Sequence, residues 1–227
     1  MESNDICHTS SVVEERNEEI EPVELFFTPH AIPEIDFKEL GLLGKMVSNH
    51  CLLEYFRMSP LEVEVCKCIR KLFTWHEKLQ EQYAEESQEQ EPLSEEALPN
   101  LWIITTSISD ELLDIFNATN QPLNWCQGVY LTEEGFQTGI VVIDRLPTTI
   151  DTLWLRLLGI GEIQQQAVSQ LIALPQKNFL RRKVLNFIGN WWSSTQEEGE
   201  LTEEHEELFV LLLPIYQQWQ KEAEQVD

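Results

Sequence analysis

The stretch LWIIT, Leu101–Thr105, is a short and uninterrupted apolar run that ends in a β-branched residue. It lies between Pro99 and Ser107, two residue types that often bound regular elements. A continuous run of this length, without polar alternation, is typical of a strand that is buried on both faces. The stretch therefore predicts a strand inside a helix-covered sheet.

The residues after this strand predict the rest of an α/β core. Ser109 is a suitable N-cap for a short apolar helix, and two further runs, GVYL at 128–131 and GIVVI at 139–143, predict strands. A strand, a helix and a strand in this order favour a right-handed parallel crossover, with 128–131 as a candidate hairpin partner of 139–143. We expect an α/β (α+β) fold with a small mixed β-sheet, flanking helices and a helical C-terminal region.

Three segments before residue 60 are expected to extend this core. PVELFFT, 22–28, alternates in its apolar positions and predicts a strand that ends at Pro29. Residues 37–47 are interpreted as a short helix or an irregular turn, and CLLEYF, Cys51–Phe56, as a strand or a buried turn. The sequence leaves both of these alternatives open.

A long helix is predicted over residues 60–84. Ser59 is placed as its N-cap, Pro60 as its first residue and Glu62 as its third, which is the arrangement of a capping box. Apolar side chains follow at helical spacing, so one stripe of the helix, formed by Val63, Cys66, Ile69, Leu72 and Phe73, is expected to pack on the core. The helix is expected to end in an acidic, glutamine-rich loop at 85–97.

The C-terminal half is predicted to be helical. In LPTTIDTLWLRLLGIGEIQQQAV, 146–168, an apolar arc at helical spacing leaves Arg156 outside it. This arc consists of Ile150, Leu153, Trp154, Leu157 and Leu158. Gly159 and Gly161 follow a helix and lack the third glycine of a dinucleotide fingerprint, so we interpret them as a left-handed C-cap and a turn. Further helices are expected at about 163–174, 178–193 and 202–221.

The chain has a formal net charge of −25, and its acidic residues are concentrated in three runs, 14–24, 81–96 and 197–207. Runs of like charge with little apolar periodicity are typical of solvated linkers and tails. Such a charge disfavours direct binding of duplex nucleic acid, because that binding depends on neutralising phosphates. A protein partner is therefore the expectation.

The same pattern predicts the domain organisation. We expect a disordered acidic N-terminus over 1–20 and a single α/β domain over 21–193 that contains the acidic loop 85–97. An acidic loop and a helix over 194–227 are expected to pack on this domain. No apolar run is long enough to cross a bilayer, the start is acidic where a secretory signal is basic, and the five cysteines lack the spacing of a disulfide framework. We expect a cytoplasmic protein without a membrane segment.

Two sets of side chains are candidates for binding. Arg156, Arg181, Arg182 and Lys183 are candidates for a small basic face, and the alternative is that they pair with nearby carboxylates. Cys66 and Cys68 lie two residues apart in a predicted helix and should point to different sides, which makes them poor zinc ligands. No local motif identifies a Cys–His nucleophile pair, and we predict no metal from these residues.

Two glutamates are candidates for catalysis, Glu24 in PVELFF and Glu54 in CLLEYF. Each is flanked by enough apolar residues to be partly buried, and carboxylates held in a cleft at strand ends can bind a metal ion or transfer protons. The alternative is that both side chains point outward from edge elements.

Several stretches resemble a group of uncharacterised cyanobacterial and myxobacterial proteins. They are LPNLWIITTSISDELLDIF, GVYL, TGIVVIDRLP, TLWLRLLGIGEIQQQAVSQLIALP and ELGLLGKMVSNHCLLEYF. The resemblance covers roughly residues 22–220. The group is in turn distantly similar to transposase-type and recombination-promoting-nuclease proteins, whose fold is restriction-endonuclease-like.

The resemblance implies a specific active-site pattern. Such nucleases use an Asp or Glu on one strand and Glu-x-Lys on the next, with the acids holding Mg²⁺ and the lysine orienting the attacking water. Glu24 matches the first acid and Glu54 the second, but the residue two after Glu54 is Phe56, and Arg57 is one place too far. The nuclease pattern is therefore incomplete.

Three functions are compatible with these observations. The leading hypothesis is a catalytically silent, nuclease-like intracellular protein without a cofactor, which acts through protein contacts made by Trp191, Trp192 and Trp219 in its helical C-terminal part. The alternative is a Mg²⁺-dependent nuclease or phosphodiesterase that uses Glu24 and Glu54. A second alternative is an acidic mimic of nucleic acid, which requires ordered carboxylates at phosphate-like spacing.

Overall fold

A computed structural model describes residues 37–87, 93–94 and 97–186, the backbone of the strand Val23–Phe27, and five helical positions between 213 and 221. The predicted disordered segment 1–20, the run 197–207 and most of the run 81–96 beyond residue 87 lie outside the described residues. The expectations for them therefore stay predictions.

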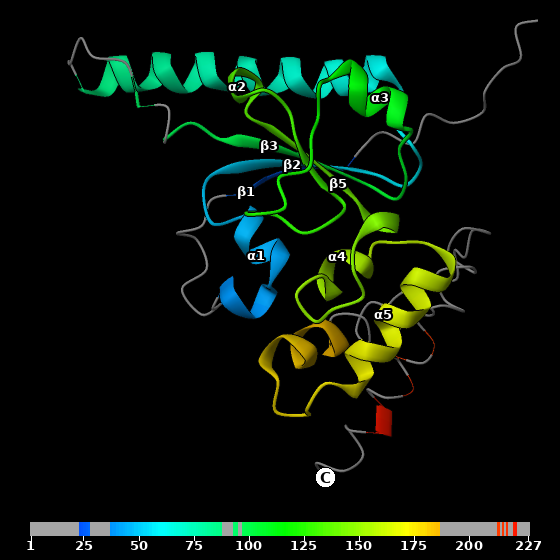
Figure 1. Cartoon of the computed structure of the whole chain (residues 1–227). Coiled ribbons are helices and arrows are strands. Elements are labelled where there is room, and N and C mark those ends of the chain that lie inside the picture. The colour runs from blue at the N-terminus through cyan, green and yellow to red at the C-terminus, as the bar shows by residue number, and fades with distance from the viewer. Residues whose placement is uncertain are drawn as a thin grey trace, which may run out of the picture.

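The core is a five-stranded mixed sheet with the order β1-β2-β3-β5-β4 (Figure 1). β1 (Val23–Phe27) runs antiparallel to β2 (Cys51–Phe56). β2, β3 (Asn100–Thr105) and β5 (Thr138–Val142) are parallel, and β4 (Val129–Leu131) closes one edge antiparallel to β5. The sheet with its flanking helices confirms the predicted α/β fold.

The strands predicted from apolar runs are confirmed to within two residues. Leu101–Thr105 forms nearly all of β3, and all five of these residues are buried, as expected for a strand covered on both faces. The two open alternatives are also resolved. CLLEYF is a strand, and residues 37–47 contain the short helices η2 (Phe37–Leu40) and α1 (Leu42–Met46).

One face of the sheet is covered by α2 (Glu62–Ser87) and α3 (Asp110–Ile115), which lie above it in Figure 1. The hydroxyl of Ser109 accepts a hydrogen bond from the Leu112 N–H at 3.2 Å, which confirms the predicted cap of α3. The core beneath these helices joins buried side chains of the sheet, of α2 and of α3 with its flanking residues. They are Leu52, Phe56, Val65, Cys68, Ile69, Leu72, Leu101, Ile103, Ile108, Leu112, Leu113, Ala118, Ile140 and Val142.

The predicted start and end of the long helix are wrong by a few residues. α2 begins at Glu62, and its N-cap is Leu61, whose carbonyl accepts the Val65 N–H at 3.1 Å. The Glu64 carboxylate accepts the Leu61 N–H at 2.5 Å and supplies the side-chain half of the cap, so Ser59 is not needed. The helix continues to Ser87, into the segment predicted as a loop at 85–97.

The opposite face of the sheet is covered by α1, α4 (Leu153–Arg156) and the segments around them (Figure 1). Trp102 lies on this face and donates its indole N–H to the carbonyl of Met46 at 3.0 Å. Gly139, its neighbour on β5, has no side chain and leaves room for the indole ring. This absence of a Cβ lets a large ring join the sheet to α1.

The described positions after residue 160 are largely helical, in agreement with the predicted helical C-terminal region. α5 (Gly161–Ala173) ends before Pro175, and residues 179–186 form a further helix. Ile215, at one of the described helical positions near the end of the chain, is fully buried. These helices and α4 share a separate apolar cluster of buried side chains. It is formed by Trp154, Val168, Leu171, Leu180, Leu185 and Ile215. No helix in the described part of the chain combines the length and the apolar character that a bilayer span requires.

The predicted apolar arc in 146–168 is wrong. α4 is a single turn whose four residues are all buried, including Arg156, whereas Ile150 and Leu158 are exposed. The reason is that the loop before the turn and α5 behind it both contact Arg156, so no side of the turn faces solvent.

The interpretation of the two glycines also needs correction. Gly161 adopts the left-handed conformation, with φ 57°, at the start of α5, and Gly159 does not. A Cβ on Gly159 would lie 3.0 Å from both the Arg156 carbonyl oxygen and the Ile143 Cγ2. Gly159 therefore allows a close approach, and the turn depends on Gly161.

We predict that Gly139→Ala destabilises the protein. The new methyl group would lie 2.1 Å from Cζ3 of Trp102, and such overpacking costs about 1–3 kcal/mol. Gly135→Ala is the matched control, because a Cβ there meets nothing within 4 Å, and it should change stability by less than about 0.5 kcal/mol. Urea unfolding followed by tryptophan fluorescence measures both, and equal midpoints would contradict the packing of Trp102 against Gly139.

Candidate functional site

The two candidate acids occupy paired backbone positions of β1 and β2. The strand register places Glu24 directly opposite Glu54. Glu54 alternates with Leu52 and Phe56, which belong to the core beneath α2, so its side chain points toward this helix. Glu54 is only 1% exposed, which contradicts the alternative in which its side chain points outward.

The cation near Glu54 comes from a helix. The ammonium Nζ of Lys71, seventeen residues further along the chain on α2, lies 3.0 Å from Oε1 of Glu54. This lysine is on α2 and not at position 56, where the nuclease pattern requires it. One feature of the sequence could have indicated the Lys71–Glu54 contact. Lys71 is three residues after Cys68, so it borders the buried stripe formed by Val65, Cys68 and Leu72.

The arrangement around Glu54 is closed. The carboxylate lies in the layer between the sheet and α2, and it lines neither the groove described below nor the shallow hollow beside α5. The described residues contain no group of three or more His, Cys, Asp or Glu side chains that could hold a metal ion. A carboxylate in this setting is suited to an ion pair that joins a helix to a sheet.

The two buried cysteines near the sheet, Cys51 and Cys68, are not activated thiols. Cys66 is exposed and Cys68 is buried, so they point to different sides of α2, as expected. Burial raises the pKa of the Cys51 thiol to about 11 and that of Cys68 to about 12, and the carboxylate of Glu54 adds to the shift at Cys68. Because the thiolate is the reactive form, neither buried thiol is activated near neutral pH.

The four residues of the predicted basic face differ in exposure, so they do not form one surface. Arg156 and Arg181 are both 1% exposed, whereas Arg182 and Lys183 are exposed. Among the described residues, the hydrogen-bond acceptors of Arg156 are neutral: the hydroxyl of Thr152, the carbonyl of Thr149 at 2.7 Å and the side-chain oxygen of Gln170. Burial lowers the pKa of its guanidinium. Arg156 therefore joins the loop before α4 to α5 and is not part of an exposed binding face.

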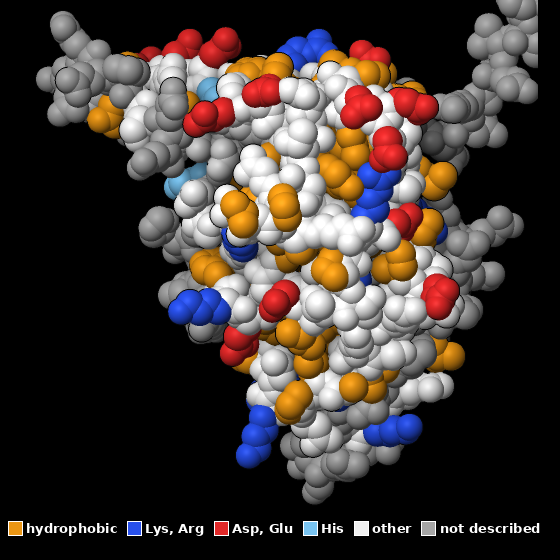
Figure 2. Space-filling model, in the orientation of Figure 1, with side chains coloured by type: hydrophobic (Ala, Val, Ile, Leu, Met, Phe, Trp, Pro, Cys, Tyr) orange, Lys and Arg blue, Asp and Glu red, His pale blue; other side chains and the backbone are white. Residues whose placement is uncertain are grey.

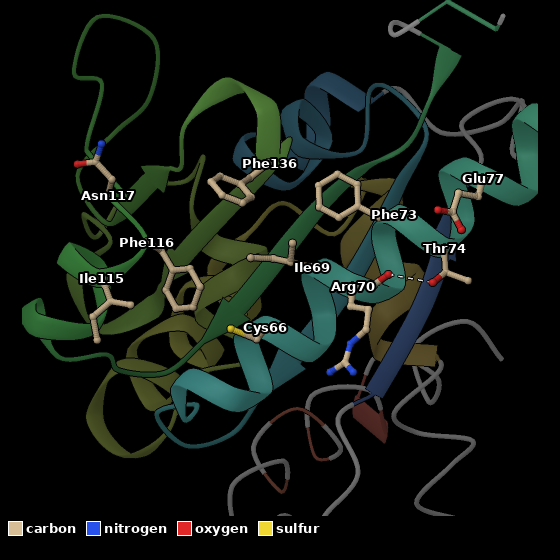
Figure 3. Close-up of a pocket in the computed structure, with 10 residues that line it drawn as sticks. All are labelled: Cys66, Ile69, Arg70, Phe73, Thr74, Glu77, Ile115, Phe116, Asn117 and Phe136. Atoms are coloured by element: carbon tan, nitrogen blue, oxygen red, sulfur yellow. Dashed lines mark hydrogen bonds between the residues drawn. The ribbon is translucent and has the colours of Figure 1, made fainter.

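An apolar groove lies between α2 and α3, on the solvent side of both helices. It encloses about 520 Å³. Figure 3 shows Ile69 and the rings of Phe73, Phe116 and Phe136 directed toward a common hollow, with Ile115 beside it. The other side chains that line it are Cys66, Arg70, Thr74, Glu77 and Asn117.

The aromatic rings of this groove remain accessible. Phe73, Ile115 and Phe136 are exposed, although each is a large apolar side chain. Exposed apolar side chains that gather in one hollow mark a binding surface more often than scattered ones do. The sequence placed Phe73 in the buried stripe of the long helix together with Val63 and Cys66, and this is wrong, because all three side chains are exposed. The groove could not be predicted from the sequence, since Phe73 on α2 and Phe136 in the short helix η4 (Glu134–Phe136) are brought together only by the tertiary fold.

The sequence-predicted docking residues Trp191, Trp192 and Trp219 lie outside the described residues. A comparison with protein-family models, with curated proteins and with solved structures finds no match to the chain. The candidate sites therefore rest on their geometry alone.

We predict that Lys71→Met destabilises the protein more than Glu54→Gln does. Lys71 keeps 41% of its side chain exposed and can turn to solvent when its partner is neutral, whereas Glu54, at 2%, stays buried as a charge when the lysine is lost. We expect a loss on the order of 2–3 kcal/mol for Lys71→Met and about 1 kcal/mol for Glu54→Gln.

The control for this pair is Lys67→Met, an exposed lysine on the same helix, which should stay within about 0.5 kcal/mol of the parent protein. Chemical unfolding of the four proteins at neutral pH makes the comparison. A Lys71→Met variant as stable as Lys67→Met would show that the Glu54–Lys71 contact does not hold α2 to the sheet.

Proposed function

We propose that this protein is a catalytically silent, nuclease-like intracellular binding protein, and that it holds a partner polypeptide in the groove between α2 and α3. The single observation that carries the proposal is the gathering of accessible apolar side chains, above all Phe73, Ile115 and Phe136, in one hollow. Aromatic and branched apolar side chains in a pocket are the usual anchors of protein interfaces.

The state of Glu54 supports the absence of catalysis in this proposal. A general base or a metal ligand must reach the substrate, and this carboxylate is buried under α2 in contact with Lys71. The four described cysteines, Cys51, Cys66, Cys68 and Cys126, are free thiols, which is usual in a reducing compartment and supports a cytoplasmic location.

We predict that Ile115→Ser weakens binding of the natural partner about ten-fold, because it removes an apolar anchor from the groove. The matched control is Ile150→Ser: both isoleucines are 57% exposed, but Ile150 lies outside the groove. The measurement is affinity capture from source-cell lysate with three full-chain baits, followed by quantitative mass spectrometry. At least one protein should be recovered equally with the parent and Ile150→Ser and about ten-fold less with Ile115→Ser.

The proposal would be contradicted if no captured protein depended on Ile115. Circular dichroism and unfolding midpoints of the two serine variants control for misfolding. Both substitutions replace an exposed side chain, so both variants should remain folded.

The nuclease function remains a second candidate, favoured by one observation: Glu24 lies opposite Glu54 in the strand register, and Lys71 contacts Glu54. Two acids and a lysine are the residue types that such a Mg²⁺ site uses. If this candidate were correct, the full chain would cleave plasmid DNA or RNA with Mg²⁺, and Glu54→Ala would abolish the cleavage. We expect no Glu54-dependent cleavage with Mg²⁺ or Mn²⁺.

A further inference from the structure

The length and the lining of the groove between α2 and α3 indicate which kind of segment it binds. Its lining side chains come from one stripe of α2, which runs from Cys66 to Glu77, and from the end of α3 with η4. At 1.5 Å per residue this stripe is about 16 Å long, or three helical turns. The groove thus matches the length of a short segment that presents two or three apolar side chains.

The groove offers few partners for a peptide backbone. The hydroxyl of Thr74 donates to the Arg70 carbonyl at 3.0 Å, and the side-chain amide of Asn117 donates to Glu133. The centre of the groove is made of phenylalanine and isoleucine side chains. A segment buried there must satisfy its own N–H and C=O groups, and a helix does so while an extended strand does not.

The lining of the groove contains one exposed acid, Glu77, and one base, Arg70, and further acids lie beside it and form what we call the acidic rim. Glu133 accepts a hydrogen bond from Asn117, and Glu134 begins the short helix that carries Phe136. On α3, Glu111 lies one helical turn before Ile115 and Asp114 lies next to it, and both acids are exposed. Figure 2 shows apolar and acidic side chains side by side over α2 and α3.

One basic residue, Arg70, is found among the described side chains that line the groove, and Figure 3 shows its guanidinium directed away from the phenylalanine rings. The chain as a whole carries a formal net charge of −25, which attracts a cationic partner over a distance and repels a second copy of itself. Charge complementarity therefore selects a basic occupant.

We propose that the groove binds a basic amphipathic helix of another protein. Its apolar side chains at positions i, i+3 or i+4, and i+7 fill the hollow between Phe73, Phe116 and Phe136, and its Lys and Arg side chains lie against the acidic rim. This inference rests on the proposed function, because it names the chemistry of the partner that the same groove takes.

The test begins with a display library of helix-forming peptides that is random in charge and apolar content. It is selected on the full-length protein, and binders to Ile115→Ser are removed. Enriched sequences should have a net positive charge and an apolar stripe at helical spacing. One enriched peptide, and a copy with each Lys or Arg replaced by Glu, are then measured by fluorescence anisotropy.

We expect the acidic copy to bind at least about ten-fold more weakly than the basic peptide, and the affinity of the basic peptide to fall several-fold between about 0.05 and 0.5 M salt. Glu77→Lys should weaken the basic peptide about five-fold or more. Glu162→Lys is the matched control: it makes the same change of charge at an exposed acid on α5, outside the groove, and should have little effect.

The outcomes separate the inference from the proposed function. If Ile115→Ser abolishes binding but Glu77→Lys and the peptide charge do not matter, the basic partner is refuted and groove binding stands. If the enriched peptides are acidic or extended, the inference is overturned. A groove-dependent dimer in sedimentation, or a library that yields no groove-dependent peptide, overturns it as well.

Discussion

The structure depends on the packing of one helix, α2, across the central strands of the sheet. The face formed by Leu52, Ile103 and Ile140 is almost entirely apolar, and leaving it in water would cost more than the stability of a domain this size. The stripe of Val65, Cys68 and Leu72 covers that face. This contact fixes the rotation of the helix, and therefore decides where every other side chain on it lies.

The fixed rotation gives α2 two roles. On the inner side, Lys71 reaches Glu54, so the one buried glutamate of β2 becomes part of a helix–sheet contact. On the outer side, Phe73 and its neighbours face α3 and form the groove. The same packing buries the Glu54 carboxylate and leaves the side chains around Phe73 exposed. For this reason the proposal links partner binding to the absence of catalysis.

The sequence predicted the strands and the fold class, whereas helix faces, helix ends and long-range contacts were predicted poorly. β3 and β5 were predictable because continuous apolar runs reflect burial on both faces. The burial of Arg156 was not, because it depends on Thr149 and Gln170, which the fold brings to the two sides of a single helical turn. Lys71 and the groove were missed for a related reason. The periodicity of α2 predicted a helix but placed Val63 and Phe73 in its buried stripe, whereas packing on the sheet buries Val65 and Cys68.

Whether Glu54 is a structural partner of Lys71 or a metal ligand is the central question for this protein. The most direct measurement is a titration of the full chain with Mn²⁺, followed by water-proton relaxation, for the parent protein and for Glu54→Gln. If Glu54 is a structural partner of Lys71, the parent protein and Glu54→Gln should give the same weak Mn²⁺ binding curve, because the substitution leaves the acidic surface residues unchanged. A stoichiometric Mn²⁺ site in the parent protein that disappears in Glu54→Gln would contradict it.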